Sequence, residues 1–360
     1  MVSSLPLPPL PLKCRLTNGR NAKFPYYCRA VALELVPAGW CRRRLKGLLA
    51  EIDRRPDAGE IRARAAYYCH LEPGQGKLPA NAMRICEQRR PKKGEVYYFD
   101  SRESLKFFPA DFRFQLMPGD GVAETQWSIL AKARPLVSCQ CPDNSDWTLL
   151  KLNKTRHFCF VHDPFSADEK APGGVFRGGV FRGKVTDRSW QGPKQKRMQF
   201  FKQWHGHPRY DLGDTGRHPV IPEWAGNKMS VWEQLRYRYV FSIEGNDVAS
   251  NLKWIMSSNS LAVMPTPTYE TWFQEGLLQP HVHYVPVAAD FSDVEQVLDW
   301  YDAHPEARQK ILDNAHAWVA RFQSPLREFL TSLLTLARYF AATSQPLPNL
   351  VPDPFPSPRG

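Results

Sequence analysis

Apolar and polar blocks between Tyr239 and Val287 give the clearest structural signal in the chain. An apolar run over 239–243 ends at the polar turn Glu244-Gly245-Asn246-Asp247, a stretch of helix length follows, and a second apolar run covers 260–264. This order predicts a parallel strand–helix–strand unit. Open α/β sheets bind nucleotides at such a turn, because helix N-termini there offer free N–H groups to phosphate.

The rest of the chain alternates strand and helix patterns in both halves. We expect strands over 96–99, 112–116, 174–182, 210–212 and 283–287, and helices over 37–53, 101–108, 194–204, 230–237, 292–303, 305–322 and 325–342. Such alternation predicts an α/β fold with two lobes.

Proline-rich and polar stretches mark the expected boundaries. Residues 1–12 and 345–360 are proline-rich and predict disordered tails. The polar stretch 162–172 marks the break between an N-terminal lobe over 13–160 and a C-terminal lobe over 161–325, followed by a helix over 326–344.

Basic residues exceed acidic ones, and the formal net charge is +12. The excess favours anionic partners: nucleic acid, nucleotide phosphates or an acidic membrane surface. The densest basic stretches are 42–44, 89–93 and 194–197, and a solvated basic surface explains each of them equally well. Arg42–Arg44 with Leu45, Leu48 and Leu49 predict either a membrane-facing helix or a helix packed on the core.

Two classes of protein are not favoured. No apolar stretch reaches the roughly 18–20 residues that span a bilayer, and residues 1–12 lack the basic start and cleavage site of a signal peptide. We therefore expect a cytoplasmic protein that binds a membrane at most peripherally. The eight cysteines are scattered, and Cys139 and Cys141 have no second pair, so we expect reduced thiols and no zinc site.

Four motifs stand out in the C-terminal half: EGNDVASNLKW (244–254), MSSNS (256–260), YETWF (269–273) and HYVPV (283–287). With these motifs the chain resembles glycosyltransferase family 90, most closely its bacterial lipopolysaccharide core branch, and 149–157 and 181–183 also fit. The resemblance covers about 95–325. It implies a GT-B fold, in which two Rossmann-like lobes face a central cleft. It also implies a nucleotide-sugar donor in the C-terminal lobe, inverting transfer and no required metal or other cofactor.

Inverting transfer requires a base for the acceptor hydroxyl, and the resemblance places that base at Asp120. Asp120 lies in the turn Met117-Pro118-Gly119-Asp120-Gly121, where an aspartate is also ordinary turn chemistry. Some animal members follow their aspartate with an aromatic residue and a proline, whereas Gly121-Val122 follow here. Asp111 is therefore the alternative base.

Cations and helix N-termini stabilise the leaving diphosphate in a metal-free site. Arg182 and Arg177 lie in duplicate Phe-Arg-Gly sequences, and the resemblance favours Arg182 as the donor ligand. Lys253 is the second cation candidate, in the helix after the glycine turn.

The same turn and helix supply polar donor-binding candidates, which are Glu244, Gly245, Ser250 and Asn251. Animal members carry an arginine where Asn251 aligns. Capping of the helix and a polar helix face are the structural alternatives for these residues. Sugar or acceptor contacts are expected at Tyr269, Glu270, Glu275, Asn153 and Lys154.

Together these features predict an inverting glycosyltransferase. It would move a sugar from a nucleotide diphosphate, with UDP as the first choice, to a glycan or lipid-linked saccharide in lipopolysaccharide core or surface polysaccharide synthesis. A non-catalytic nucleotide- or glycan-binding protein of the same fold is the alternative. A nucleic-acid partner is not expected, because no nucleic-acid-binding motif accompanies the charge. A kinase is favoured even less, because the GxxxxGK[ST] motif is missing.

Overall fold

The computed structural model describes residues 6–120, 125–138, 141, 143–180, 195–217, 219, 221–345 and 347. The chain divides into two compact units, each assembled from separate stretches. Unit 1 comprises 1–21, 156–268 and 274–321, and unit 2 comprises 22–155, 269–273 and 322–360. The crossing at 155–156 lies close to the boundary expected at 160, but the crossings at 21, 268–274 and 321 were not expected.

Unit 1 is built on a five-stranded parallel sheet with the order β12-β10-β9-β7-β8. The strands are β7 (Ala171–Gly178), β8 (Tyr210–Asp214), β9 (Tyr237–Phe241), β10 (Leu261–Met264) and β12 (Val285–Pro286). Helix α9 (Leu252–Met256) joins β9 to β10, which confirms the predicted strand–helix–strand unit. Because all five strands run the same way, their carboxyl ends share one edge of the sheet.

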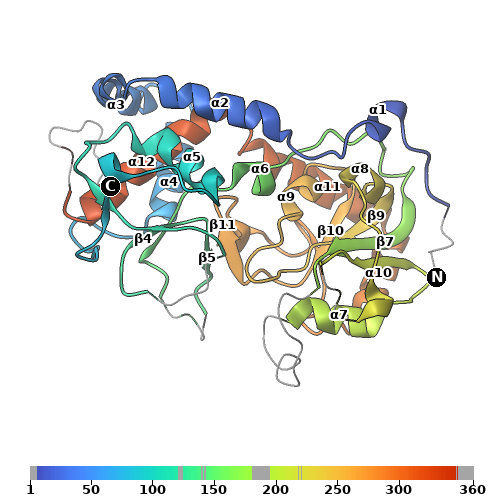
Figure 1. Cartoon of the computed structure of the whole chain (residues 1–360). Coiled ribbons are helices and arrows are strands. Elements are labelled where there is room, and N and C mark those ends of the chain that lie inside the picture. Colours follow the sequence, from blue (N-terminus) through green and yellow to red (C-terminus); the bar gives the residue numbers. More distant parts are fainter. Residues whose placement is uncertain are drawn as a thin grey trace. The chain divides into compact units, whose positions relative to one another are not determined.

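Helices cover both faces of this sheet. Helix α7 (Lys196–Trp204) lies on one side, and α9 and α11 (Pro305–Ala320) lie on the other (Figure 1). Phe200 of α7 packs on Phe241 of β9 with ring centroids 4.6 Å apart. The remaining helices of unit 1 are α1 (Leu12–Arg15), α8 (Val231–Gln234) and α10 (Val294–Ala303).

Unit 2 contains a smaller parallel sheet with the order β3-β4-β6. These strands are β3 (Leu116–Met117), β4 (Ile129–Ala131) and β6 (Trp147–Leu149). Two antiparallel pairs complete the unit: β1 (Met83–Arg84) with β2 (Arg113–Phe114), and β5 (Ala133–Pro135) with β11 (Tyr269–Thr271). Parallel sheets in both units confirm the α/β class, whereas the facing lobes of a GT-B fold stay a prediction.

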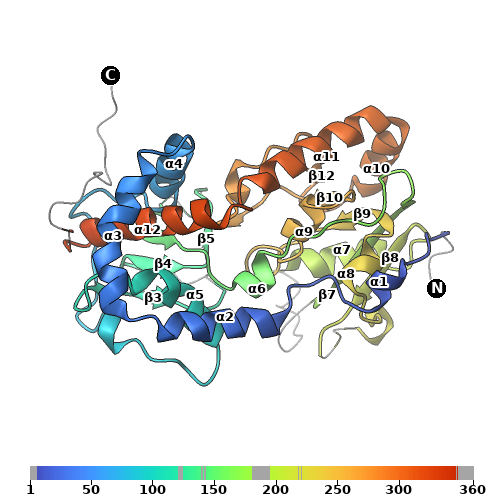
Figure 2. The same cartoon turned by 90° about the horizontal axis from the view of Figure 1, so that it is seen from above.

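Helix α12 (Pro325–Ala342) is the central helix of unit 2. It packs on α3 (Ala38–Ile52), α4 (Ala58–Tyr68) and α5 (Glu95–Leu105), as Figure 2 shows from above. Leu330, Leu333, Leu336 and Tyr339 of α12 are fully buried in this core. Helix α2 (Lys23–Leu35) lies outside α5, and the short α6 (Lys154–His157) spans the crossing at 155–156.

Several local expectations differ from the structure. The helix expected over 230–237 ends at Gln234, and Tyr237 already belongs to β9. Residues 96–99 were expected as a strand but form part of α5, because Tyr98 and Phe99 are buried against Ala30 of α2 when the segment is helical. Residues 6–11, inside the expected N-terminal tail, are described, and Pro8 accepts a hydrogen bond of 2.6 Å from Arg236 Nε. In the described part of the chain, no helix combines the length and apolarity that a bilayer span requires.

Candidate functional site

Three chain segments meet at the carboxyl edge of the unit 1 sheet. Glu244 follows β9, Thr268 follows β10, and Lys196 is the first residue of α7. The Glu244 carboxylate accepts hydrogen bonds from Lys196 Nζ at 2.6 Å, from the Thr268 backbone N–H at 2.9 Å and from the Thr268 hydroxyl at 2.6 Å. The Lys196 and Glu244 side chains remain 19% and 13% exposed, so a ligand at this edge can reach both charges.

Arg197 ties two neighbouring strand ends together at the same edge. Its guanidinium donates to the Ile243 carbonyl from Nε at 3.0 Å and from Nη2 at 2.8 Å, and to the Gly179 carbonyl from Nη1 at 2.8 Å. A Cβ at Gly245 would lie 3.3 Å from the guanidinium carbon, so a larger residue at 245 would press on Arg197. The glycine therefore permits the close approach of the turn to this arginine.

The predicted helix N-terminus after the glycine turn begins later than expected. Residues 246–249 precede α9, which starts at Leu252. Asn251 at its start donates to the Phe241 carbonyl at 3.0 Å and accepts from the Ser242 hydroxyl at 3.1 Å, while Ser250 is half-buried. Asn251 thus fixes the end of β9, and α9 has only five residues to orient toward an anion.

Two predicted ligands of unit 1 contact each other. The Lys253 ammonium pairs with the Glu275 carboxylate, and their side chains are 0% and 2% exposed. Lys253 was predicted to bind diphosphate and Glu275 to bind sugar. In this arrangement both are buried below the surface, and a buried pair of opposite charges is a structural feature.

Arg177 is also engaged within the fold. Its guanidinium donates to the carbonyls of Asn227 at 2.9 Å, Phe176 at 2.9 Å and Asp211 at 2.7 Å, and to the Asp211 carboxylate at 2.6 Å. These contacts tie β7 to β8. The competing candidate, Arg182, lies outside the described residues.

The carboxyl edge of the unit 2 sheet carries Asp120. This residue follows β3, and its carboxylate lies 2.9 Å from Lys132 Nζ, which follows β4. The Lys132 side chain is 2% exposed and that of Asp120 is 30% exposed. The ion pair fixes the carboxylate at this edge while part of it stays exposed, and a general base must be within reach of the hydroxyl it deprotonates. The alternative base, Asp111, is exposed on the turn before β2.

A cavity of about 230 Å³ lies in unit 2 between α2, α5 and the start of α12. Its lining combines aromatic rings of Tyr26, Phe99, Phe322 and Phe329 with charged groups. Lys154 pairs there with Glu103, and its backbone N–H donates to Asp100 at 3.0 Å. Burial raises the pKa of Asp100 above its usual range, and Lys154 partly offsets that increase. Apolar walls with a few fixed polar groups are typical of sites for small organic ligands.

Asn153, the other predicted contact in this region, has a positive φ of 54° and donates from its side chain to the Tyr97 hydroxyl at 3.4 Å. It lies between two lining residues of the cavity, Lys151 and Lys154. The structure therefore brings only Lys154, among the five predicted sugar or acceptor contacts, to the cavity wall.

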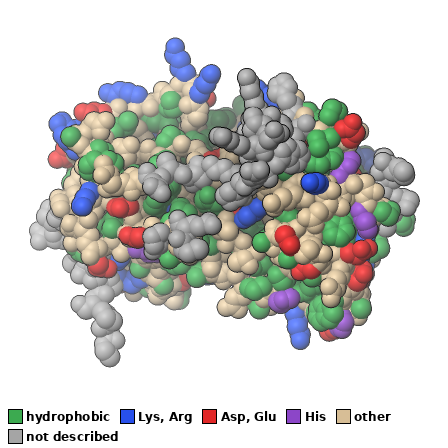
Figure 3. All heavy atoms as spheres, turned by 90° about the horizontal axis from the view of Figure 1, so that it is seen from below, with side chains coloured by type: hydrophobic (Ala, Val, Ile, Leu, Met, Phe, Trp, Pro, Cys, Tyr) green, Lys and Arg blue, Asp and Glu red, His purple; other side chains and the backbone are tan. Residues whose placement is uncertain are grey.

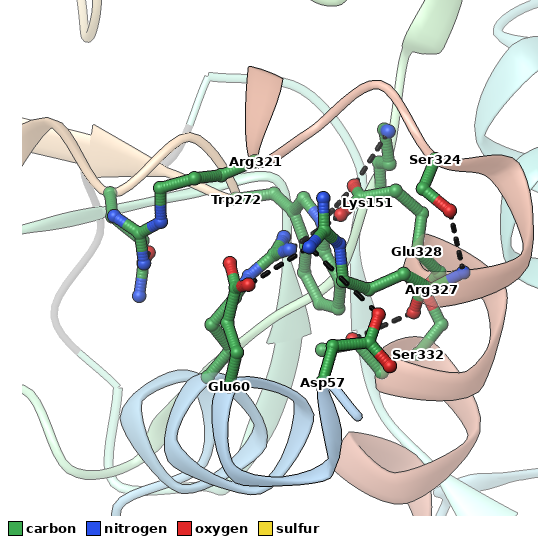
Figure 4. Close-up of polar contacts among 12 residues, drawn as sticks. Asp57, Glu60, Lys151, Trp272, Arg321, Ser324, Arg327, Glu328 and Ser332 are labelled. Carbon is green, nitrogen blue, oxygen red and sulfur yellow. Dashed lines mark hydrogen bonds and ion pairs between the residues drawn. The ribbon is translucent and has the colours of Figure 1, made fainter. Parts of the chain in front are cut away.

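A buried ion-pair network surrounds Glu328 of α12. Its carboxylate lies 2.6 Å from Arg64 Nη1 and 2.7 Å from Lys151 Nζ, and it accepts from Trp272 Nε1 at 2.8 Å. Figure 4 shows Lys151 and Trp272 converging on this carboxylate. Burial would raise the pKa of Glu328, but Lys151 and Arg64 outweigh burial and hold the pKa below its usual range.

Tyr269 and Glu270 lie in the segment 269–273, which also contains Trp272 of the Glu328 network. Glu270 is 1% exposed and accepts from Arg134 Nε at 2.8 Å and from the Tyr67 hydroxyl at 2.5 Å. Tyr269 is half-buried and pairs with Pro135 in the β11–β5 ladder. Both predicted sugar contacts therefore anchor the stretch that crosses into unit 2.

Sequence reasoning missed Lys196, Arg197, Thr268 and Lys132. The signal for the first two was present in the basic stretch 194–197, which a solvated surface also explained. On the face in Figure 3, basic side chains are interspersed with acidic and apolar ones, so no patch of one sign covers that face. Among the described residues, no group of three His, Cys, Asp or Glu side chains has an arrangement suited to a metal ion.

Comparison with known proteins connects these features to one family. The model of glycosyl transferase family 90 matches residues 167–326. O-glucosyltransferase LpsA from Dichelobacter nodosus is 36% identical over 325 residues, which are 89% of this chain and 95% of that protein.

More distant relatives share shorter segments. Protein O-glucosyltransferase 2 of Danio rerio is 30% identical over 84 residues, or 23% of this chain and 16% of that protein. Human protein O-glucosyltransferase 3 is 24% identical over 112 residues, or 31% of this chain and 22% of that protein.

Proposed function

Because this chain belongs to glycosyltransferase family 90 and is a glycosyltransferase, we propose that it transfers a sugar, with inversion, from a nucleotide diphosphate to a saccharide hydroxyl. The observation that carries the proposal is the meeting of Lys196, Glu244 and Thr268 at the carboxyl edge of the unit 1 parallel sheet. Open α/β sheets bind nucleotides at this edge. The name of the relative, O-glucosyltransferase LpsA, supports glucose as the sugar, and UDP-glucose is the first donor to test.

In this proposal Lys196 supplies positive charge to the leaving diphosphate, and Glu244 accepts hydrogen bonds from ribose or sugar hydroxyls. Lys196 and Glu244 can bind the ligand while they stay paired, because Lys196 offers three donors and Glu244 four acceptor positions. Arg182 remains a proposed second cation. Protein cations then supply the electrostatic stabilisation that a metal ion provides in other transferases, so no metal is required.

Asp120 is the proposed base. Lys132 holds its carboxylate by an ion pair at 2.9 Å, while the 30% exposed side chain stays open to an acceptor hydroxyl. The two sheet edges, Asp120 on one and Glu244 on the other, would be brought together if the units face each other as in a GT-B fold.

The cavity of unit 2 is the proposed acceptor subsite. Its volume of about 230 Å³ suits a single sugar ring, and its aromatic rings and charged groups match the apolar faces and hydroxyls of a saccharide. An acceptor of the lipopolysaccharide core or another surface polysaccharide, carried on lipid at the inner leaflet, fits this chemistry and the net charge of +12.

The first experiment is a thermal-shift panel with UDP-, GDP-, ADP- and CMP-sugars, with and without chelator. We expect a chelator-insensitive rise in melting temperature with one nucleotide, because a ligand that binds only the folded state stabilises it. No rise with any nucleotide would contradict a preformed donor site.

Lys196→Met then locates the donor. Loss of a hydrogen bond to a charged group costs about 1.5–3 kcal/mol, so donor affinity should fall by roughly 10- to 100-fold. Lys202→Met is the matched control, because Lys202 is exposed on the same helix, away from Glu244. Equal affinities of the two variants would place the diphosphate elsewhere.

A further inference from the structure

Helix α2 presents an apolar stripe to solvent. Phe24, Val31 and Leu35 are 81%, 44% and 81% exposed, and Cys28 between them is exposed as well. Their spacing of four, three and four residues places them on one face of the helix. Isolated exposed apolar residues are ordinary, but an aligned set of large ones along a single helix marks an interaction surface.

The opposite face of α2 already has its packing partner. Ala30 is buried against Tyr98 and Phe99 of α5, with Tyr26 packed beside them. Figure 2 shows α2 along the outside of unit 2, next to α5. The helix is therefore fixed to the unit by one face while the stripe points away from it.

Basic residues accompany the stripe. Residues 22–46 contain six basic side chains and one acidic side chain, Glu34, and all six basic residues are exposed. They are Lys23, Arg29, Arg42, Arg43, Arg44 and Lys46. One of them, Arg29, pairs with Glu103 of α5 at 3.1 Å. Helix α3 also exposes Trp40, 49% of which is accessible, with Arg44 stacked 4.6 Å from its ring.

We propose that α2 and the start of α3 dock unit 2 onto an anionic lipid bilayer. The apolar stripe would enter the boundary between headgroups and acyl chains, and the arginines would contact lipid phosphates. Charge complementarity selects this partner, because a second copy of this face would bring the same basic residues together. For Leu45, Leu48 and Leu49 of α3 the sequence left membrane contact and core packing open, and the structure favours the core, because Leu45 and Leu49 are 4% and 0% exposed.

Vesicle sedimentation tests the proposal on the full chain. We expect binding to phosphatidylcholine vesicles that contain phosphatidylglycerol, little binding to pure phosphatidylcholine, and weaker binding as salt is added. Phe24→Ser with Leu35→Ser should reduce vesicle partitioning at least ten-fold. Arg42→Gln, Arg43→Gln and Arg44→Gln together should reduce it about 10- to 100-fold and weaken the salt dependence.

Met83→Ser with Leu277→Ser is the matched control. Met83 and Leu277 are large apolar residues that are each 43% exposed, and neither lies on α2 or α3. The control should bind vesicles as the parent does. The proposal is overturned if the parent ignores anionic vesicles, or if the stripe variant binds as well as the control.

Analytical ultracentrifugation tests whether a second copy of the chain, rather than a membrane, binds the apolar stripe of α2. A concentration-dependent dimer that Phe24→Ser with Leu35→Ser abolishes would assign the stripe to a second copy and overturn the membrane assignment. The nucleotide thermal shift of the stripe variant should match that of the parent. Vesicle binding therefore fails or succeeds independently of the donor site.

Discussion

At the scale of single residues, buried carboxylates fix the motif YETWF in place. Glu270 pairs with Arg134, and Glu328 receives the indole N–H of Trp272. Glu275, shortly after the motif, pairs with Lys253. These contacts hold the stretch at both ends, so the density of charged and aromatic residues there reflects anchoring as well as any contact with sugar.

Glu328→Gln should destabilise unit 2 by about 3–5 kcal/mol at neutral pH, because Arg64 and Lys151 would lose a buried counter-charge. Since the folded-state pKa of Glu328 is lowered, its contribution is present above the unfolded-state value near 4.3 and is lost as the pH falls below it. The difference in melting temperature between parent and variant should therefore stay constant from pH 7 to about pH 5 and shrink as the pH falls below about 4.3.

Glu51→Gln controls for general effects of removing a carboxylate. Glu51 lies 3.9 Å from Arg54 and its side chain is 48% exposed, so its loss should change stability by under about 0.5 kcal/mol. A Glu328 variant as stable as this control, or a melting difference that does not depend on pH, would refute the buried-network interpretation.

Asp120→Asn should abolish sugar transfer while donor affinity stays within a few-fold. The amide keeps the size of the side chain but cannot take a proton from the acceptor. Donor affinity by calorimetry and turnover with an acceptor saccharide measure the two effects separately. Asp111→Asn is the comparison variant, and an enzyme that keeps most of its turnover without Asp120 would rule out this base.

Lys253→Met should reduce stability by about 3–5 kcal/mol, because Glu275 would remain buried without its cation. The sequence alone predicted weaker diphosphate binding instead. Urea unfolding and donor affinity, measured on the same protein, separate these outcomes. If the variant is as stable as the parent but binds the donor weakly, Lys253 binds the donor as the sequence predicted.

At the scale of helices and strands, long and well-punctuated segments could be predicted from sequence. The expected helix over 325–342 agrees with α12, which begins at a proline, and the expected strands around 239–243 and 260–264 agree with β9 and β10. The strand predicted over 96–99 was wrong, because buried aromatic residues occur in helices as well as in the strands that they favour. The contacts of Lys253 and Lys132 could not be predicted, since each partner follows a different strand or loop, 22 and 12 residues away, and its position depends on how the strands pair.

Gly174→Ala tests the packing of β7 on β9. A Cβ at Gly174 would lie 2.5 Å from the Phe241 ring, which forces a shift of the strand or the ring. We expect a loss of about 1–3 kcal/mol, measured by urea unfolding. In contrast, Gly47→Ala in α3 meets nothing within 4 Å and should stabilise the protein by about 0.4–1 kcal/mol. Equal effects of the two changes would contradict the close approach.

At the scale of the whole molecule, the interleaving of the chain was the least predictable property. Residues 269–273 enter unit 2 through the pairing of β11 with β5 and through the Glu328 network, and neither feature is visible in the sequence. Hydrophobic patterning describes which residues are buried, and it does not tell in which of two cores they are buried. The α/β class was therefore accessible from sequence, whereas the assignment of segments to units was not.

The position of α12 also has a consequence for protein synthesis. Leu330, Leu333 and Leu336 fill a core whose other walls, α3 and α4, leave the ribosome far earlier. The apolar faces of α3 and α4 therefore stay uncovered until residues 325–342 have been synthesised, because contacts between distant segments form late. A nascent chain stalled or truncated before α12 should therefore be a substrate for chaperones and proteases.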